Sequence, residues 1–199
     1  LCGMAMFTGA VSAIFEPDEA SLAYSTAVAR TPFDPVYPDA DATYAAVHTL
    51  DLGSVVPRVV QPGSARAANT STAKTMAGTP ITRAFIGSCA SGRMEDLRAA
   101  ALVLDGRQVA PGVELNVVPT STAVHDQAER EGILDVLRSA GATIVRSSCD
   151  FCFGYQKPLA AGENCISTGV LNISGRMGSV DANIYMASPF TVAESAVAG

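Results

Sequence analysis

The sequence has no cluster of lysine and arginine residues and carries little charge of either sign. Charged residues make up 16% of the 199 positions, and the net charge is −6 with an isoelectric point near 4.8. Because nucleic-acid binding requires clustered basic side chains that contact phosphates, this balance argues against a nucleic-acid partner. The sequence also lacks a run of about eighteen apolar residues, which excludes a membrane-spanning helix.

Signals of secretion are absent as well. The five cysteines are odd in number, and their spacing does not suggest a disulfide scaffold, so we expect a reducing, cytoplasmic location. No signal peptide is visible, because Leu1 leads directly into apolar sequence without a basic region or a small-residue cleavage site. We therefore expect this chain to be a piece of a larger protein.

Apolar residues are plentiful, at 48% of the chain, which is enough for one sizeable core or two small ones. Residues 1–78 are predicted to form a helical and irregular segment that continues from a missing upstream part. We expect helices at Met4–Ile14 and Glu19–Ala29 and a short strand at Thr49–Val56, in a segment otherwise interrupted by prolines. The only domain boundary that we predict lies near residue 79.

Residues 79–199 show alternating strand and helix patterns. The expected strands are Ile81–Ile86, Val113–Val118, Ala142–Val145 and Ile184–Ala187, and the expected helices are Met94–Leu104, Ala123–Ala140 and Phe190–Ala198. This alternation predicts a three-layer α/β/α fold with a largely parallel sheet and helices on both of its faces.

Two of these strands lead directly into loops that contain cysteine. Cys89 follows the strand Ile81–Ile86, and Cys149 and Cys152 follow the strand Ala142–Val145. Because the carboxyl ends of parallel strands meet at one edge of a sheet, we expect the three thiols to converge there.

Three converging thiolates can hold three corners of a [4Fe–4S] cluster and leave one iron open. A structural zinc site would use four ligands, and a thioredoxin-like site would use two. Spacing alone also allows all of these cysteines to be buried core residues. We expect that role for Cys2 and Cys165, which lie in apolar surroundings.

The motifs around these cysteines resemble the aconitase family, and within it the large subunits of isopropylmalate isomerases. The matching stretches are Ile86-Gly87-Ser88-Cys89, Gly92–Leu97, Cys149-x-x-Cys152-x-Gly154, Gly162-Glu163-x-Cys165 and Ala187-Ser188-Pro189. The likeness covers nearly the whole chain. It implies an aconitase-type iron–sulfur hydro-lyase or isomerase for a hydroxy carboxylic acid, with a [4Fe–4S] cluster held by Cys89, Cys149 and Cys152.

The resemblance also implies partners. The proton-transferring residues of the family come from a missing N-terminal portion of the large subunit and from a swivelling small subunit or domain. We therefore assign no general base in this chain. Its only histidines are His48 and His125, and we expect His125 to be a surface residue in a charged helix.

The sequence departs from the family near the substrate. The replaced positions are Gly3, Phe7, Ala90, Val170 and Leu171, where the family has Asn, Glu, Thr, Asn and Arg. The family's later arginine remains as Arg176, so we expect Arg176 and Ser91 to contact the substrate. Because Leu171 cannot donate to a carboxylate, the substrate should be less charged than citrate. The alternative is a non-catalytic iron–sulfur binding or scaffold protein with the same fold.

Overall fold

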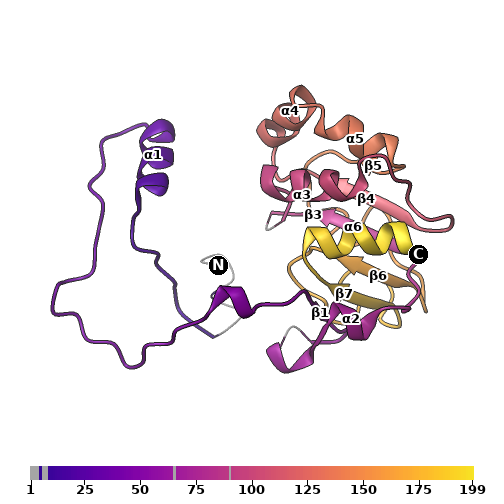
Figure 1. Cartoon of the computed structure of the whole chain (residues 1–199), viewed down its shortest axis with the longest axis horizontal. Helices are drawn as coiled ribbons and strands as arrows, with labels where there is room; N and C mark the ends of the chain where they lie inside the picture. The colour runs from indigo at the N-terminus through magenta and orange to yellow at the C-terminus, as the bar shows by residue number, and fades with distance from the viewer. Residues whose placement is uncertain (1–4, 6–8, 65, 90) are drawn as a thin grey trace. The chain divides into compact units, whose positions relative to one another are not determined.

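The computed structural model describes residues 5, 9–64, 66–89 and 91–199, which form two compact units, Leu1–Gly53 and Ser54–Gly199. The described residues of the first unit contain one α-helix, α1 (Glu19–Val28), as expected for Glu19–Ala29 (Figure 1). Asp18 caps it, since its side chain accepts a 2.7 Å hydrogen bond from the backbone N–H of Ser21.

The prediction of a helix at Met4–Ile14 is wrong for the residues of this segment that the structure describes. Residues 9–14 form a turn and irregular chain, and residues 4 and 6–8 lie outside the described residues. The side chains of Val11 and Ile14 are exposed. No apolar face packs there to offset the entropy cost of forming a helix.

The second unit is built on a seven-stranded sheet with the order β2-β1-β7-β6-β3-β4-β5. The strands are β1 (Arg58–Val60), β2 (Thr70–Thr72), β3 (Arg83–Gly87), β4 (Glu114–Val118), β5 (Thr143–Ile144), β6 (Asn164–Ser167) and β7 (Asn183–Met186). The strands from β3 to β7 pair in parallel, whereas β1 pairs antiparallel with both β2 and β7. The predicted α/β class with a largely parallel sheet is confirmed.

Short helices connect the strands or lie before and after them. They are α2 (Ala73–Met76), α3 (Met94–Leu104), α4 (Thr122–Arg130), α5 (Ile133–Ser139) and α6 (Pro189–Ala198), with 3-10 turns η2 (Leu52–Ser54) and η3 (Ala67–Asn69). None of the described helices is long and apolar enough to cross a membrane.

Three expectations about these elements differ from the structure. The segment Thr49–Val56 is not a strand but irregular chain around η2, and β1, β2 and β6 were not expected. Their pairing in the sheet, rather than a pattern in the sequence, makes these three segments strands. The single helix expected at Ala123–Ala140 is two helices, because Gly132 adopts a left-handed conformation (φ +73°) and ends the first. The predicted boundary near residue 79 lies inside the second unit.

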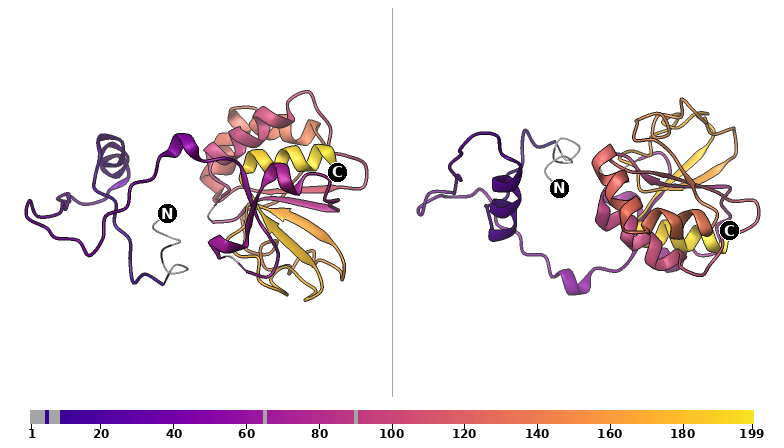
Figure 2. Two further views of the ribbon diagram at one scale, coloured as in Figure 1. Left: turned by 60° about the horizontal axis from the view of Figure 1, so that its bottom comes forward. Right: turned by 90° about the horizontal axis from the view of Figure 1, so that it is seen from above.

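The two faces of the sheet are covered differently. Leu97 of α3, Leu137 of α5 and Val192 of α6 pack in one buried cluster on the first face. On the second face, Phe85 and Ile184 of the sheet pack against side chains from the loops 145–163 and 168–182, which are orange to gold in Figure 2. The prediction of helices on both faces is therefore wrong for the second face. In the described part of the chain, loops cover that face, and one of them carries cysteines.

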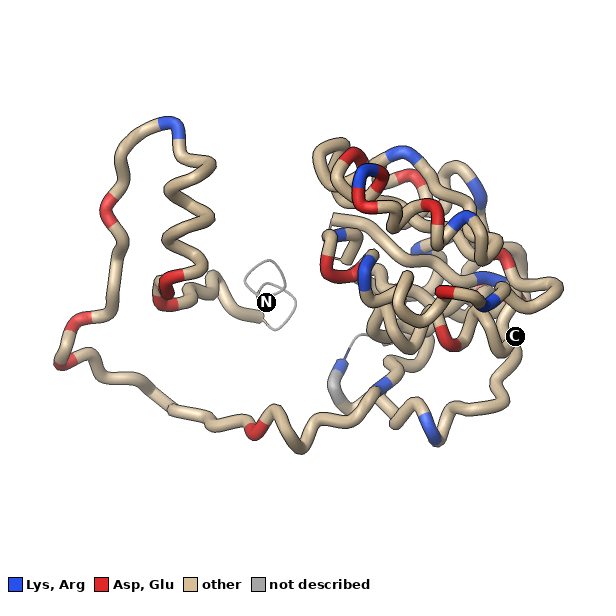
Figure 3. The backbone as a smooth tube through the Cα atoms, turned by 45° about the horizontal axis from the view of Figure 1, so that its top comes forward, with Lys and Arg blue, Asp and Glu red and all other residues tan. Residues whose placement is uncertain are grey.

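Charged residues of both signs alternate over the helices of this unit (Figure 3). Arg98 of α3 pairs with Glu131 at 2.8 Å, and Arg138 of α5 pairs with Glu129 at 2.8 Å. Exposed pairs of this kind stabilise a protein by about 1 kcal/mol at most. The apolar cluster beneath them therefore holds the helices on the sheet.

Candidate functional site

The cysteine-bearing loops leave the sheet at one edge. Strand β3 runs parallel to β4 with Gly87 opposite Val118, and β5 runs parallel to β4 with Ile144 opposite Val117. The loop with Cys89 follows β3, and the loop with Cys149 and Cys152 follows β5. Both loops thus begin at the carboxyl ends of strands, where α/β sheets bind their ligands.

The turn that carries Cys89 is held tightly against β4. Gly87 has a φ of +145°, and a Cβ atom there would lie 2.3 Å from the carbonyl oxygen of Val118. Its N–H donates to Thr168 Oγ1 at 2.9 Å. Ser88 then has a φ of +83°, which non-glycine residues rarely adopt and which surrounding contacts must enforce. These constraints present Cys89 at the surface of the edge.

The loop after β5 places its two cysteines in different surroundings. Cys149 is exposed, whereas Cys152 is buried beside Phe85 and Val118 in the cluster on the second face. The ring of Phe151 stacks on that of Phe85 with a centroid distance of 6.3 Å. This stacking ties the paired-cysteine loop to strand β3, which leads into Cys89.

The described thiols are free, and they are not gathered into a closed ligand set. Cys89, Cys149, Cys152 and Cys165 form no disulfide. Across residues 5, 9–64, 66–89 and 91–199, no group of three or more His, Cys, Asp or Glu side chains lies close enough to hold a metal ion. The ligand roles of Cys89, Cys149 and Cys152 therefore stay predictions.

Arg176 lies against the paired-cysteine loop. Its Nη2 donates to Cys152 Sγ at 3.5 Å, and its Cζ lies 3.7 Å from the centroid of the Phe153 ring. Its Nε is buried and has no hydrogen-bond partner among the described residues. The guanidinium therefore stands beside a predicted ligand and retains one unused donor.

Comparisons with known proteins match this region to one family. A model of the aconitase family (aconitate hydratase) matches residues 62–199. The chain belongs to the aconitase family.

The relatives of this aconitase-family chain are named as large subunits. It is 48% identical to the 3-isopropylmalate dehydratase large subunit of Mycolicibacterium smegmatis over 85% of this chain and 40% of the relative. It is 42% identical to large subunit 1 of the same enzyme from Methanopyrus kandleri over 100% of this chain and 47% of the relative. It is 48% identical to the homoaconitase large subunit of Thermus thermophilus over 83% and 40%. The chain thus spans about half the length of the relatives it matches.

The other predicted site residues lie close to these loops in sequence. Ser91 is half-buried in the turn after Cys89. Leu171 is half-buried, and Val170 packs against the cluster that contains Cys152. The predictions for Cys2, Gly3, Phe7 and Ala90 concern positions outside the described residues. His125 is half-buried on α4, with Nδ1 3.3 Å from Asp126 Oδ1, and His48 is exposed.

Sequence reasoning missed two residues near the site. Asn172 is buried and donates to the carbonyl oxygens of Gln61 and Ser64, so it holds the chain beside Arg176 in place. Phe153 contacts Arg176, although it looks like an ordinary apolar residue of a C-x-x-C-F-G sequence. The position of Phe153 directly after Cys152, a predicted ligand, was the only sequence feature that could have indicated its role.

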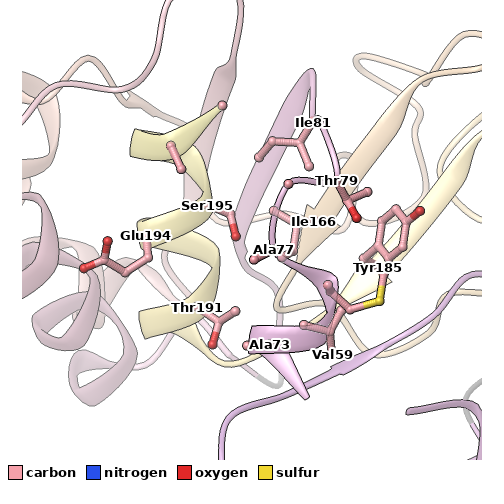
Figure 4. Close-up of a pocket in the computed structure, with 14 residues that line it drawn as sticks. Val59, Ala73, Ala77, Thr79, Ile81, Ile166, Tyr185, Thr191, Glu194 and Ser195 are labelled. Carbon is pink, nitrogen blue, oxygen red and sulfur yellow. The ribbon is translucent and has the colours of Figure 1, made fainter. Parts of the chain in front are cut away.

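A cavity of about 290 Å³ lies elsewhere in the aconitase-family unit, on the face of the sheet that α6 covers (Figure 4). Val59, Ile166 and Tyr185 of the sheet line it together with Ala73 of α2 and Thr191 of α6. None of the described residues of the cysteine-bearing loops lines it. This cavity is therefore separate from the predicted cluster site.

Cys165 lies at the centre of the sheet, fully buried on strand β6. Desolvation raises the pKa of its thiol from an ordinary value near 9 to about 12. A neutral thiol is a poor metal ligand, since the thiolate is the ligating form. Burial thus supports the structural role expected for this cysteine.

Because the pKa of the Cys165 thiol is raised, the folding stability of the protein should fall at alkaline pH. Between about pH 9 and pH 12 the unfolded chain loses the thiol proton and the folded chain keeps it, so stability falls as pH rises. Cys165→Ala removes this dependence. Urea unfolding at about pH 8 and pH 10.5 should show the wild-type protein losing about 2 kcal/mol more than the variant. Equal losses in the two proteins would contradict the raised pKa.

Proposed function

We propose that this chain is the cluster-bearing part of an aconitase-type hydro-lyase that removes water from, or adds it to, a hydroxy carboxylic acid. The observation that carries the proposal is the placement of Cys89 and of the Cys149/Cys152 pair after β3 and β5, the two parallel strands that flank β4, within the stretch that matches the aconitase family. The names of the relatives, isopropylmalate dehydratase and homoaconitase large subunits, support the same class of reaction.

Cys89, Cys149 and Cys152 would hold a [4Fe–4S] cluster. These three side chains are suitable ligands for such a cluster, because all three thiols are free and iron–sulfur clusters bind soft thiolate sulfur. The buried Nε of Arg176, whose Nη2 contacts Cys152, has no partner in the described part of the chain, which also indicates that an acceptor belongs beside this loop. When bound, the cluster supplies an open iron that acts as a Lewis acid toward a substrate oxygen.

The chain's own residues would select and orient the substrate. Arg176 offers a planar fork of donors that matches a carboxylate, and Ser91 offers a hydroxyl next to Cys89. Leu171 offers no donor at the position where the family has a second arginine. The site should therefore take a hydroxy acid that is less charged than citrate or isopropylmalate and that places an apolar group, rather than a carboxylate, against Leu171.

Proton transfer is assigned to parts of the protein beyond this chain. We propose that an upstream portion of the large subunit and a swivelling small subunit or domain complete the site. The relatives' designation as large subunits favours such a partner. The free thiols suit a reducing compartment, for which we propose the cytoplasm.

Metal analysis of the complete protein tests this proposal. After anaerobic purification it should contain about four irons and four acid-labile sulfides per chain. Together with its small subunit, the protein should then catalyse the removal of water from a hydroxy carboxylic acid or the reverse addition. Stoichiometric zinc without sulfide after anaerobic preparation would contradict the proposal.

A further inference from the structure

The guanidinium of Arg176 is held on two sides. One face lies on the ring of Phe153, with Cζ 3.7 Å from the ring centroid. One edge points at Cys152, with Nη2 donating to Sγ at 3.5 Å. Stacking on a ring occupies a face of the guanidinium and leaves its in-plane N–H groups available. The arrangement therefore fixes the plane of the fork without using all of its donors.

The ring of Phe153 is itself supported. It stacks on the ring of Tyr155, with centroids 5.7 Å apart and planes at 7°. Between them, Gly154 has a φ of +72°, and a Cβ there would lie 2.3 Å from the carbonyl oxygen of Met177. Only glycine permits this approach, which brings the paired-cysteine loop directly against the backbone next to Arg176.

Backbone hydrogen bonds join the two segments. Leu159 N–H donates to the carbonyl oxygen of Met177 at 2.8 Å, and Ser179 N–H donates to that of Leu159 at 2.9 Å. Met177 and Leu159 are also buried in the same apolar cluster as Cys152. The contact between Phe153 and Arg176 is therefore made by side chains whose backbones are fixed relative to each other.

We infer that Phe153 is a positioning residue that holds the Arg176 guanidinium in the orientation needed to bind one carboxylate of the substrate. This inference rests on the proposed function for the role of Arg176. The resemblance implies two substrate-binding arginines, and with leucine at position 171 only Arg176 is left of them. How rigidly its guanidinium is held before the substrate binds therefore affects affinity more than it would if two arginines shared the binding. The buried Nε–H has no acceptor in the described part of the chain, and a carboxylate oxygen would provide one.

The first test is an NMR measurement on the complete, iron-free protein labelled with ¹⁵N. The Arg176 Nε–H resonance, assigned by its loss in Arg176→Lys, should be shifted upfield by the ring current of Phe153. Phe153→Leu should abolish this shift, and Phe153→Tyr should preserve it. Phe190→Leu is the matched control, because Phe190 is half-exposed on α6. An unchanged resonance in Phe153→Leu would overturn the inference whether or not the protein is an enzyme.

The second test uses the reconstituted complete enzyme. Phe153→Leu should raise the KM for a hydroxy monocarboxylate by about threefold to tenfold and leave kcat within about twofold, since a cation–π contact is lost. Phe153→Tyr should restore the KM. An unchanged KM in Phe153→Leu would overturn the positioning role and leave the proposed function intact. Absence of cluster and turnover in the wild-type protein would instead contradict the proposed function, and the NMR result would still decide whether Phe153 orders Arg176.

Discussion

Replacement of Cys89, Cys149 or Cys152 by serine is expected to abolish the cluster. A serine hydroxyl is a harder donor than a thiolate and stays protonated at neutral pH, so it cannot replace the sulfur on iron. Each variant should lose nearly all of the about four irons and four sulfides per chain after anaerobic reconstitution. Iron and sulfide analysis, together with the visible absorbance of the cluster, measures this.

Cys165→Ser is the matched control for these three variants. Cys165 is free, like the others, but it is buried in strand β6 rather than in a loop at the carboxyl edge. This variant should keep its iron and sulfide, although a hydroxyl in the core should lower its stability by about 1–3 kcal/mol. Circular dichroism of all four variants separates a missing ligand from an unfolded chain. Full iron and sulfide content in Cys89→Ser would remove Cys89 from the ligand set.

Replacement of Arg176 by alanine is expected to weaken binding of any carboxylate substrate by about 100-fold or more. Truncating one partner of a desolvated charge pair costs about 2–5 kcal/mol, because the other charge is left unpaired. The effect should appear in KM and in kcat/KM, with iron and sulfide content unchanged. Arg98→Ala is the control, since Arg98 pairs with Glu131 on the surface. Wild-type affinity in Arg176→Ala would exclude Arg176 from substrate binding.

The same reasoning predicts the effect of position 171. Leu171→Arg should shift the preference of the complete enzyme toward more highly carboxylated acids, because it restores a second fork. The wild-type enzyme should use citrate and isopropylmalate poorly. Turnover of either acid at an ordinary enzymatic rate would show that another basic residue binds the second carboxylate.

Some helices and strands could be predicted because the residue pattern within the element itself favours that conformation. Helix α3 begins and ends at the predicted residues Met94 and Leu104, since its apolar residues recur with the helical period and acids occupy its first turn. Strands β3 and β4 could be predicted because most of their residues are apolar and each lies before a helical pattern in an alternating strand–helix order. In contrast, β1 and β2 have three residues each, and only their pairing in the sheet makes them strands.

The candidate site divides in the same way. Motif spacing singled out Cys89, Cys149, Cys152 and Arg176, since these residue types carry the chemistry and follow expected strands or motifs. The contact of Arg176 with Phe153 spans 23 positions and could not be read from spacing. It depends on the close approach of Gly154 to Met177. That approach follows from the path of the loops on the second face of the sheet.

By itself, the sequence determined the strand–helix order, the parallel direction of the central strands and the loops in which the cysteines lie, because periodicity and chain direction are local properties. Tertiary structure alone decided that loops rather than helices cover the second face, that Cys152 is buried while Cys89 and Cys149 are exposed, and that Arg176 lies on Phe153. Burial and side-chain contacts of this kind depend on which distant segments pack together. They arise from the apolar surface that the whole unit buries when it folds.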